Sequence, residues 1–146
     1  MLKRILFGAV AALVFAVVPR ATAGASPSPA WYVVQNINAY RATYGLAPLA
    51  IQTANLQAAA EAWDENLVRA NALGHNPDLM LQAPPGATTV GENVGVGPTV
   101  SSVELGFDQS AEHRANLLSP YFTMVGVAVI RSPYTGQVFI TEDFAN

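Results

Sequence analysis

The sequence of 146 residues contains no cysteine. The chain can therefore form no disulfide and carry no lipid on an N-terminal cysteine, so its hydrophobic core alone has to hold the fold together. The sequence also lacks a glycine-rich phosphate loop with lysine, a His-Glu-x-x-His motif and a Gly-x-Ser-x-Gly motif. These absences argue against the phosphate-binding and hydrolytic chemistries that such motifs serve. Serine-hydrolase chemistry would need an unmarked nucleophile such as Ser110 beside a histidine.

Basic residues are scarce after the first 20 positions. Three of the seven, Lys3, Arg4 and Arg20, lie within those positions, and the other four are all arginines. Because ten acidic residues accompany these four arginines, residues 24–146 have a formal charge of −6 with neutral histidines. Nucleic acids and anionic membrane surfaces are bound through clusters of lysine or arginine. The charge therefore excludes both as partners, although it identifies no other.

The N-terminus has the pattern of an export signal. Two basic residues precede the apolar run 5–18, and residues 21–23 provide the small-x-small pattern that a signal peptidase accepts. The run has 14 residues, whereas a helix needs roughly 20 to cross a bilayer. We therefore predict a signal peptide over residues 1–23, cleaved after Ala23, and a secreted protein without a stable membrane anchor.

The rest of the chain is predicted to form a single domain. Residues 24–29 are small residues, proline and serine, which indicates a linker, and the domain follows at residues 30–146. The 123 residues after position 23 suffice for one hydrophobic core but not for two. No internal repeat is evident, and we expect a monomer.

The period of the apolar residues changes along this domain. Steps of three and four residues predict helices in the first half, and alternation predicts strands near the C-terminus. The expected elements are helices at 31–44, 53–74, 99–107 and 110–118, and strands at 91–96, 125–129 and 137–143. The last two strands form a hairpin with a turn at 132–136, and the proline-rich stretch 75–90 is a long surface loop. Helices before strands, without βαβ alternation, indicate an α+β domain with a largely antiparallel sheet.

Several large or charged side chains fit structural roles. Trp31, Trp63 and Phe107 lie at helical spacing, which favours the core over a ligand platform. Four carboxylates are interpreted as belonging to solvated helix faces. They are Glu61, Glu65, Glu104 and Asp108.

The chain has only two histidines, His75 and His113, and both lie beside polar, loop-like segments. Neutral imidazole binds metals and transfers protons near neutral pH, so the two would form a site if they converged with a carboxylate. Glu92, flanked by a glycine that leaves space for a ligand, is one candidate, and Glu112, next to His113, is a second. The structural alternatives are histidines that satisfy helix ends, an exposed strand charge at Glu92, and a favourable dipole interaction of Glu112 in the first turn of a helix.

Short motifs in this order resemble the landmarks of bacterial CAP domains. They are Ile37-Asn38-Ala39-Tyr40-Arg41, Gly45-Leu46-Ala47-Pro48-Leu49, Gly74-His75-Asn76-Pro77, Gly91-Glu92-Asn93-Val94, the run from His113 to Leu118 and the run from Val125 to Val129. CAP domains are relatives of cysteine-rich secretory proteins, insect venom antigen 5 and plant pathogenesis-related proteins. The resemblance covers residues 31–144, and the residues of these motifs are similar to those of CAP domains exported by actinobacteria.

The resemblance implies a three-layer α-β-α sandwich, with helices on both faces of a small antiparallel sheet. It also implies that His75, Glu92 and His113 line one cleft, which in some members holds a divalent cation such as zinc. The sequence departs from the bacterial pattern by having Phe107 where a tryptophan is usual and Ser-Ala-Glu-His where Ser-Pro-Gly-His is usual. This departure leaves open whether Glu112 joins the cleft.

Three functions remain open. The resemblance favours a secreted, non-catalytic module that binds a small apolar ligand such as a lipid or sterol, a cell-wall component or a host protein. The loop residues 79–81 could form an apolar wall for such a ligand, or they could cap the core. The alternative is a metal-assisted hydrolase, in which His75 and His113 hold zinc and Glu92 binds it or activates its water. The third is a structural surface protein with a vestigial cleft.

Overall fold

The computed structural model describes residues 27–146. The predicted signal peptide at 1–23 and the first part of the predicted linker lie outside these described residues and stay predictions. The elements in chain order are α1 (Pro29–Thr43), β1 (Ala50–Ile51), α2 (Leu56–Ala70), α3 (Leu79–Gln82), β2 (Val90–Gly97), α4 (Val100–Gln109), α5 (Ala111–Leu117), β3 (Met124–Arg131) and β4 (Val138–Ala145). None of the helices in this described part is long and apolar enough to cross a membrane.

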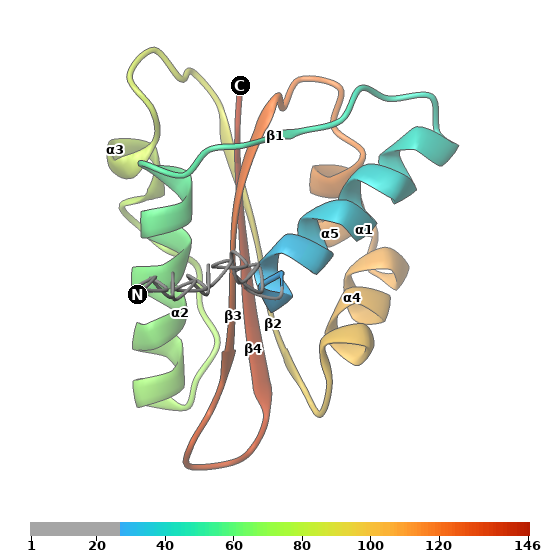
Figure 1. Cartoon of the computed structure of the whole chain (residues 1–146). Helices are drawn as coiled ribbons and strands as arrows, with labels where there is room; N and C mark the ends of the chain where they lie inside the picture. Colours follow the sequence, from blue (N-terminus) through green and yellow to red (C-terminus); the bar gives the residue numbers. More distant parts are fainter. Residues whose placement is uncertain (1–26) are drawn as a thin grey trace, which may run out of the picture.

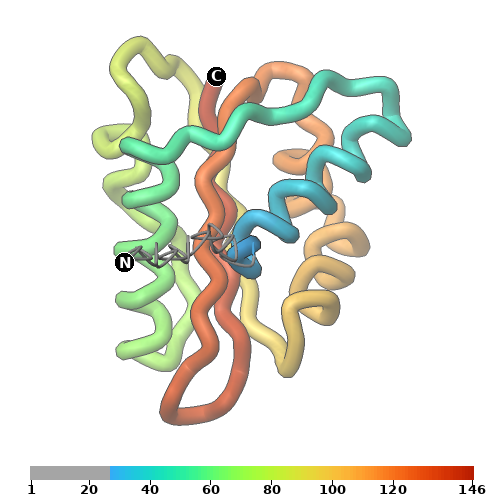
Figure 2. Tube along the Cα trace, viewed as in Figure 1, coloured from blue at the N-terminus to red at the C-terminus, as the bar shows by residue number. Residues whose placement is uncertain are grey.

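The elements form three layers (Figure 1). The sheet lies in the middle, α2 and α3 lie on one side of it, and α1, α4 and α5 lie on the other. The connector between α1 and α2, which contains β1, crosses from one helical layer to the other (Figure 2). The predicted α+β fold, an α-β-α sandwich, is therefore confirmed.

The four strands lie in the order β1-β3-β4-β2. β4 pairs antiparallel with β2 and with β3. The largely antiparallel sheet that the sequence predicts is confirmed, with one unpredicted strand, β1, which pairs parallel with β3 and makes the sheet mixed. Ala50 N donates to Thr123 O and Gln52 N donates to Val125 O, each at 2.9 Å. β1 has only two residues, which is too short to show the alternation that marks a strand in a sequence.

The first helix begins at Pro29, two residues before its predicted range of 31–44. Ser28 Oγ accepts a hydrogen bond from Trp31 N at 3.2 Å, and Pro29 occupies the first helical position. A serine cap satisfies a backbone N–H that has no partner inside the helix, and proline at this position has no N–H to satisfy. The start of α1 is therefore encoded in three neighbouring residues.

The second helix is shorter than its predicted range of 53–74. Gln52 Oε1 accepts hydrogen bonds from the backbone N–H groups of residues 55 and 56 at 2.7 and 3.0 Å, so a side chain outside the predicted range caps α2. At the other end Asn71 adopts the left-handed conformation with φ of 48°, and the helix stops there rather than at Gly74. After glycine, asparagine is the residue type that most readily ends a helix in this way.

The predicted loop 75–90 contains one short helix, α3. Leu79 is 4 % exposed and packs with Leu56 and Ala59 beneath α2, whereas Met80 and Leu81 are exposed. Of the three loop residues at 79–81, the first thus caps the core.

Apolar side chains fill both interfaces of the sheet. One cluster lies between the sheet and the layer of α1, α4 and α5, and two smaller clusters lie beneath α2. α2 approaches β3 so closely that a Cβ on Gly126 would lie 2.2 Å from the carbonyl carbon of Leu56. Only glycine allows the helix to pack at this distance.

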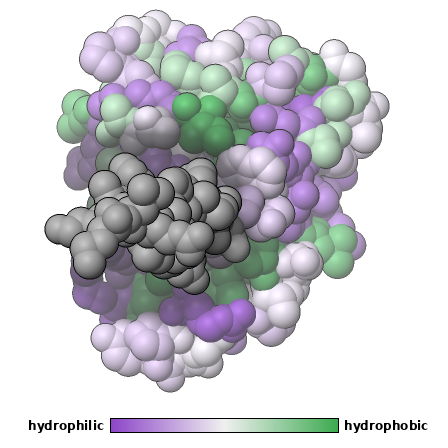
Figure 3. Space-filling model, viewed as in Figure 1, coloured by the Kyte–Doolittle hydropathy of each residue, from purple (hydrophilic) through white to green (hydrophobic). Residues whose placement is uncertain are grey.

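The three aromatic residues expected in the core differ in their burial. Phe107 is buried as predicted and Trp63 is half-buried, but Trp31 is 41 % exposed and its predicted core position is wrong. α1 contributes Val34 and Ile37 to the core cluster instead. Figure 3 shows hydrophobic residues in small patches among hydrophilic ones on this face of the molecule.

Candidate functional site

His75 and Glu92 form a hydrogen-bonded pair at the edge of the sheet. His75 lies in the segment after α2, and Glu92 lies on the edge strand β2. His75 Nδ1 is 2.7 Å from Glu92 Oε1, and Asn76 N donates to the same oxygen at 2.9 Å. The side chain of His75 is 70 % exposed, while that of Glu92 is 5 % exposed. Glu92 therefore holds the imidazole by one ring nitrogen and leaves Nε2 open to solvent.

His113 approaches the same strand from the opposite helical layer. It lies on α5, is half-buried, and its ring centroid is 4.9 Å from that of Phe107. Burial lowers the pKa of His113, and the positive charge of His75 lowers it further. The neutral imidazole is therefore favoured. The structure brings His75, Glu92 and His113 to one strand edge, the first two from the side of α2 and the third from α5.

A groove of about 270 Å³ runs beside β2 at His113. Leu73 contributes from the segment after α2, and the residues Val94, Val96, Val103, Phe107 and His113 complete the principal walls. Its other lining residues are glycines and serines, so His113 carries the only basic or acidic side chain of the lining in the described part of the chain. A mostly apolar concave site with a few fixed polar groups is the usual form of a ligand site.

Glu112 and Ser110 have supporting roles beside this groove. Glu112 is exposed in the first turn of α5, lies outside the groove lining, and raises the pKa of His113 through its negative charge. Ser110 Oγ accepts a hydrogen bond from His113 N at 3.4 Å. The serine hydroxyl thus caps α5, and Ser110 also belongs to the groove lining.

Two asparagines tie α5 to β2. Asn116 Nδ2 donates to Glu92 O at 3.1 Å and to Asn93 Oδ1 at 2.9 Å. Asn93 Nδ2 in turn donates to His113 O at 3.2 Å and to Glu142 Oε2 at 2.9 Å. These bonds fix the helix that carries His113 against the strand that carries Glu92. Sequence reasoning missed both asparagines, although both lie inside the motifs that carry the resemblance.

Three further carboxyl groups are buried around the site. Asp143 pairs with Glu92 across β4 and β2, and burial, followed by the negative charge of Glu92, raises the pKa of Asp143 to about 8. Burial also raises the pKa of Glu142 to about 8 and that of Asp64 to about 6. Every residue of β4 is buried, because this strand is paired on both edges and covered on both faces. A Thr-Glu-Asp run in a sequence indicates an exposed strand, so sequence reasoning missed Glu142 and Asp143.

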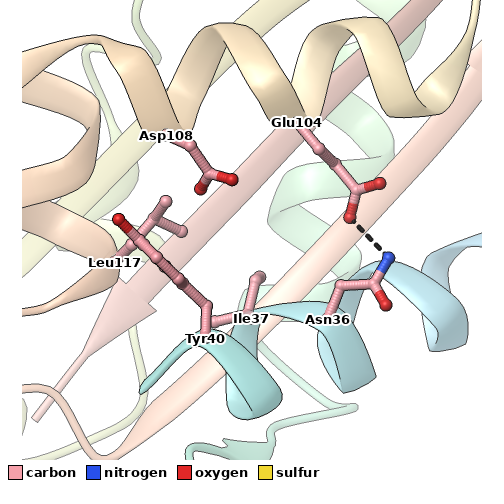
Figure 4. Close-up of a pocket in the computed structure, with 6 residues that line it drawn as sticks. All are labelled: Asn36, Ile37, Tyr40, Glu104, Asp108 and Leu117. Atoms are coloured by element: carbon pink, nitrogen blue, oxygen red, sulfur yellow. Dashed lines mark hydrogen bonds between the residues drawn. The ribbon is translucent and has the colours of Figure 1, made fainter. Parts of the chain in front are cut away.

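A smaller cavity lies between α1 and α4 (Figure 4). Its volume of about 50 Å³ holds a few water molecules. Asn36 Nδ2 donates to Glu104 Oε1 at 2.9 Å, and Tyr40 and Asp108 complete its polar lining. Glu104 and Asp108, predicted on solvated helix faces, are half-buried: α4 turns both toward α1, and burial raises the pKa of each.

The fold and the site define a class of protein: an α-β-α sandwich in which His113 lines a groove beside the edge strand, while His75 and Glu92 form a hydrogen-bonded pair at the same strand edge, outside the groove lining. The chain belongs to the CAP family, because the model of the cysteine-rich secretory protein family matches residues 34–144. No curated protein matches the sequence.

Solved structures share this fold. An outer surface protein from Borrelia burgdorferi has a TM-score of 0.71 at 14 % identity, over 79 % of this chain and 90 % of that one. An extracellular protein with an SCP domain from Bacillus anthracis has a TM-score of 0.67 at 24 % identity, over 79 % of this chain and 39 % of that one. A cysteine-rich secretory protein from Staphylococcus aureus has a TM-score of 0.63 at 21 % identity, over 85 % of this chain and 40 % of that one. At these identities the likeness shows the fold alone.

Proposed function

We propose that this chain is an exported, non-catalytic CAP domain that binds a ligand in the groove beside β2. The observation that supports this most is the groove itself, with a volume of about 270 Å³, apolar walls and one half-buried imidazole. Such a site suits a ligand that is itself largely uncharged. The ligand classes that fit are a small apolar molecule, a cell-wall component and a segment of a host protein.

The hydrogen bonds of Glu92 favour binding over catalysis. Glu92 Oε1 is engaged by both His75 and Asn76, and the side chain is 5 % exposed. A general base has to reach a proton of the substrate directly or through one water molecule. Glu92 is placed behind His75, so it orients the imidazole and does not itself face the groove opening.

Export is supported by the N-terminal sequence and by the descriptions of proteins with the same fold. Residues 1–23 have the basic, apolar and small-residue regions of a cleavable signal. The similar proteins from Borrelia burgdorferi and Bacillus anthracis are described as outer surface and extracellular proteins. N-terminal sequencing of protein recovered from the culture medium is expected to begin at Gly24. A chain that remains with the cells and begins at Met1 would contradict export.

A substitution that fills the groove tests the binding function. Gly106 lies on α4 and lines the groove, and a Cβ added there meets no atom within 4 Å. Gly106→Phe should therefore occupy the groove without displacing its walls. Leu105, its exposed neighbour outside the groove lining, provides the control Leu105→Phe.

The probes are palmitate, a sterol and a soluble cell-wall fragment, each titrated into the three proteins by calorimetry. A probe that binds the unsubstituted protein is expected to lose about tenfold or more in affinity with Gly106→Phe and to keep its affinity with Leu105→Phe. Equal affinity for all three proteins would place the binding surface elsewhere.

A metal-assisted hydrolase is the second candidate, and the His75-Glu92 pair favours it. Histidine ligands of metals usually bond to a carboxylate through their second ring nitrogen, as His75 Nδ1 does here. The residues that would hold zinc are His75 and His113, with Glu92 behind His75. Within residues 27–146 no three histidine, aspartate or glutamate side chains are grouped to hold a metal ion, so water or substrate would complete the coordination. Bound zinc would supply an activated water for hydrolysis.

Zinc titration by calorimetry tests this second candidate. One equivalent should bind at neutral pH and be lost in the double variant His75→Ala, His113→Ala. Both substitutions lie at exposed or half-buried positions, so the fold should persist. A protein that binds no zinc would contradict the hydrolase.

A further inference from the structure

The backbone of β2 presents hydrogen-bonding groups to the groove. Near the opposite edge of the sheet, on β3, Gln57 Nε2 donates to Val127 O at 2.7 Å and Gln57 Oε1 accepts from Val127 N at 3.1 Å. Val127 therefore turns its N–H and C=O away from β4. This orientation alternates residue by residue in an antiparallel ladder. The register of β3 with β4 and of β4 with β2 extends this alternation across the sheet. The N–H and C=O groups of Val94 and Val96 therefore also point away from the sheet.

A hydrogen bond to β2 supports this orientation of its backbone N–H and C=O groups. Asn116 Nδ2 donates to Glu92 O at 3.1 Å, and Glu92 has the same orientation as Val94 because the two are two residues apart. Side-chain amides thus take the place of a missing neighbouring strand at both sheet edges, Gln57 at Val127 and Asn116 at Glu92.

Val94 and Val96 have no such partner. Outside the strand pairing, no backbone or side-chain hydrogen bond within residues 27–146 reaches their N–H or C=O groups. Both residues line the groove, and Val94 is only 8 % exposed. Unpaired N–H and C=O groups at a sheet edge can pair with an added strand, and such groups cost free energy where they are withdrawn from water without a partner.

The charge of the groove limits the classes of ligand that fit it. The lining carries no arginine, lysine, aspartate or glutamate, and His113 is its one imidazole. A phosphate or a carboxylate would find no lysine or arginine in it. An acyl chain would fill it but leave the groups of Val94 and Val96 unpaired. A neutral polypeptide backbone matches both the charge and the unpaired groups.

We propose that the groove binds an extended segment of another protein, which adds a strand to β2 at Val94 and Val96. This inference rests on the proposed function of the groove and specifies its ligand class. In strand addition the backbone hydrogen bonds give affinity, and pockets for alternate side chains give specificity. Here the groove between Leu73 and Phe107 would receive one such side chain. The outward groups of β2 repeat at roughly 6.7 Å, the spacing of every second residue in a strand.

A tethered peptide tests the proposal without knowledge of the natural partner. Thr-Val-Thr-Val-Thr is fused after Asn146 through a flexible Gly-Ser linker. The C-terminus lies beside the start of β2, because Ala145 pairs with Val90, so the linker has to span only part of the strand. Tethering raises the effective concentration of the peptide to the millimolar range. In the matched control five prolines replace the peptide, which removes every backbone N–H.

Hydrogen exchange of the Val94 and Val96 amides, followed by NMR, is the readout. The Thr-Val fusion should slow exchange at both amides by about tenfold or more relative to the proline fusion, and Gly106→Phe should restore fast exchange. Equal exchange rates in the two fusions would overturn strand addition. If they are equal while palmitate, a sterol or a cell-wall fragment binds in a Gly106-dependent manner, strand addition is wrong and the groove remains a binding site.

Discussion

Glu92 and Asp143 face one another across the paired strands β2 and β4. Asp143 is 0 % exposed and its two carboxyl oxygens have no hydrogen-bond partner among the described residues, whereas Glu92 bonds to the exposed His75. The candidate site is therefore backed by a buried acid that stays protonated near neutral pH, because burial and the charge of Glu92 raise its pKa to about 8.

Stability should fall as the pH rises toward 8. The pKa values of Glu142 and Asp143 are raised in the folded protein to about 8 from ordinary values of 4.5 and 3.8. The folded state thus keeps protons that the unfolded chain has released. The stability linked to them is complete below the ordinary values and is lost as the pH rises through about 8, at about 1.4 kcal/mol per pH unit for each proton.

Urea unfolding between pH 6.5 and pH 8 measures this slope. His113 is neutral over most of this range, since its pKa is lowered, so it contributes little. The double variant Glu142→Gln, Asp143→Asn should show a much flatter dependence. A wild-type stability that rises with pH over this range would contradict the burial of these protons.

The two charged neighbours of His113 should shift its pKa in opposite directions. His75→Gln removes a positive charge that lowers the pKa of His113, so the pKa should rise; Glu112→Gln removes a negative charge that raises it, so the pKa should fall. NMR titration of the His113 ring protons in each variant measures both shifts. The site geometry would be wrong if both variants shifted the pKa in the same direction.

Asn116→Ala should destabilise the protein by about 1–3 kcal/mol, because it removes the donor to Glu92 O and to Asn93 Oδ1. Gln109→Ala, at an exposed position at the end of α4, is the control. Urea unfolding compares the two. Equal losses in both variants would show that the asparagine bridge between α5 and β2 adds nothing to stability.

Gly126→Ala should destabilise by about 3 kcal/mol, since its Cβ would lie 2.2 Å from the backbone of Leu56 and force α2 away from β3. The control is Gly106→Ala, where a Cβ meets no atom within 4 Å. Alanine is the better helix former, so that variant should gain up to about 1 kcal/mol. Thermal unfolding measures both variants. Equal stability of the two variants would contradict the close packing of α2 on the sheet.

Much of the fold could be predicted because its helices carry their own boundary signals. Ser28, Thr99 and Ser110 each accept a hydrogen bond from the backbone three residues later and begin the predicted helices. The two elements that were missed, β1 and α3, have two and four residues, too few for a period to appear. The parallel pairing of β1 also depends on β3, more than 70 residues further along the chain.

The candidate site was predicted in part. His75, Glu92 and His113 could be singled out by residue type and resemblance, since imidazole and carboxylate carry chemistry wherever they lie. Asn93 and Asn116 could not, because their roles come from contacts across 20 or more residues. The burial of the Thr-Glu-Asp run in β4 likewise follows from two helical layers that no local pattern reveals.

The most direct test of the groove is a crystal structure of the protein with the probe that binds it most tightly. The account predicts density for that probe between Leu73 and Phe107, alongside Val94 and Val96 of the edge strand. Density only at another surface, such as the small cavity between α1 and α4, with the groove holding water alone, would contradict it.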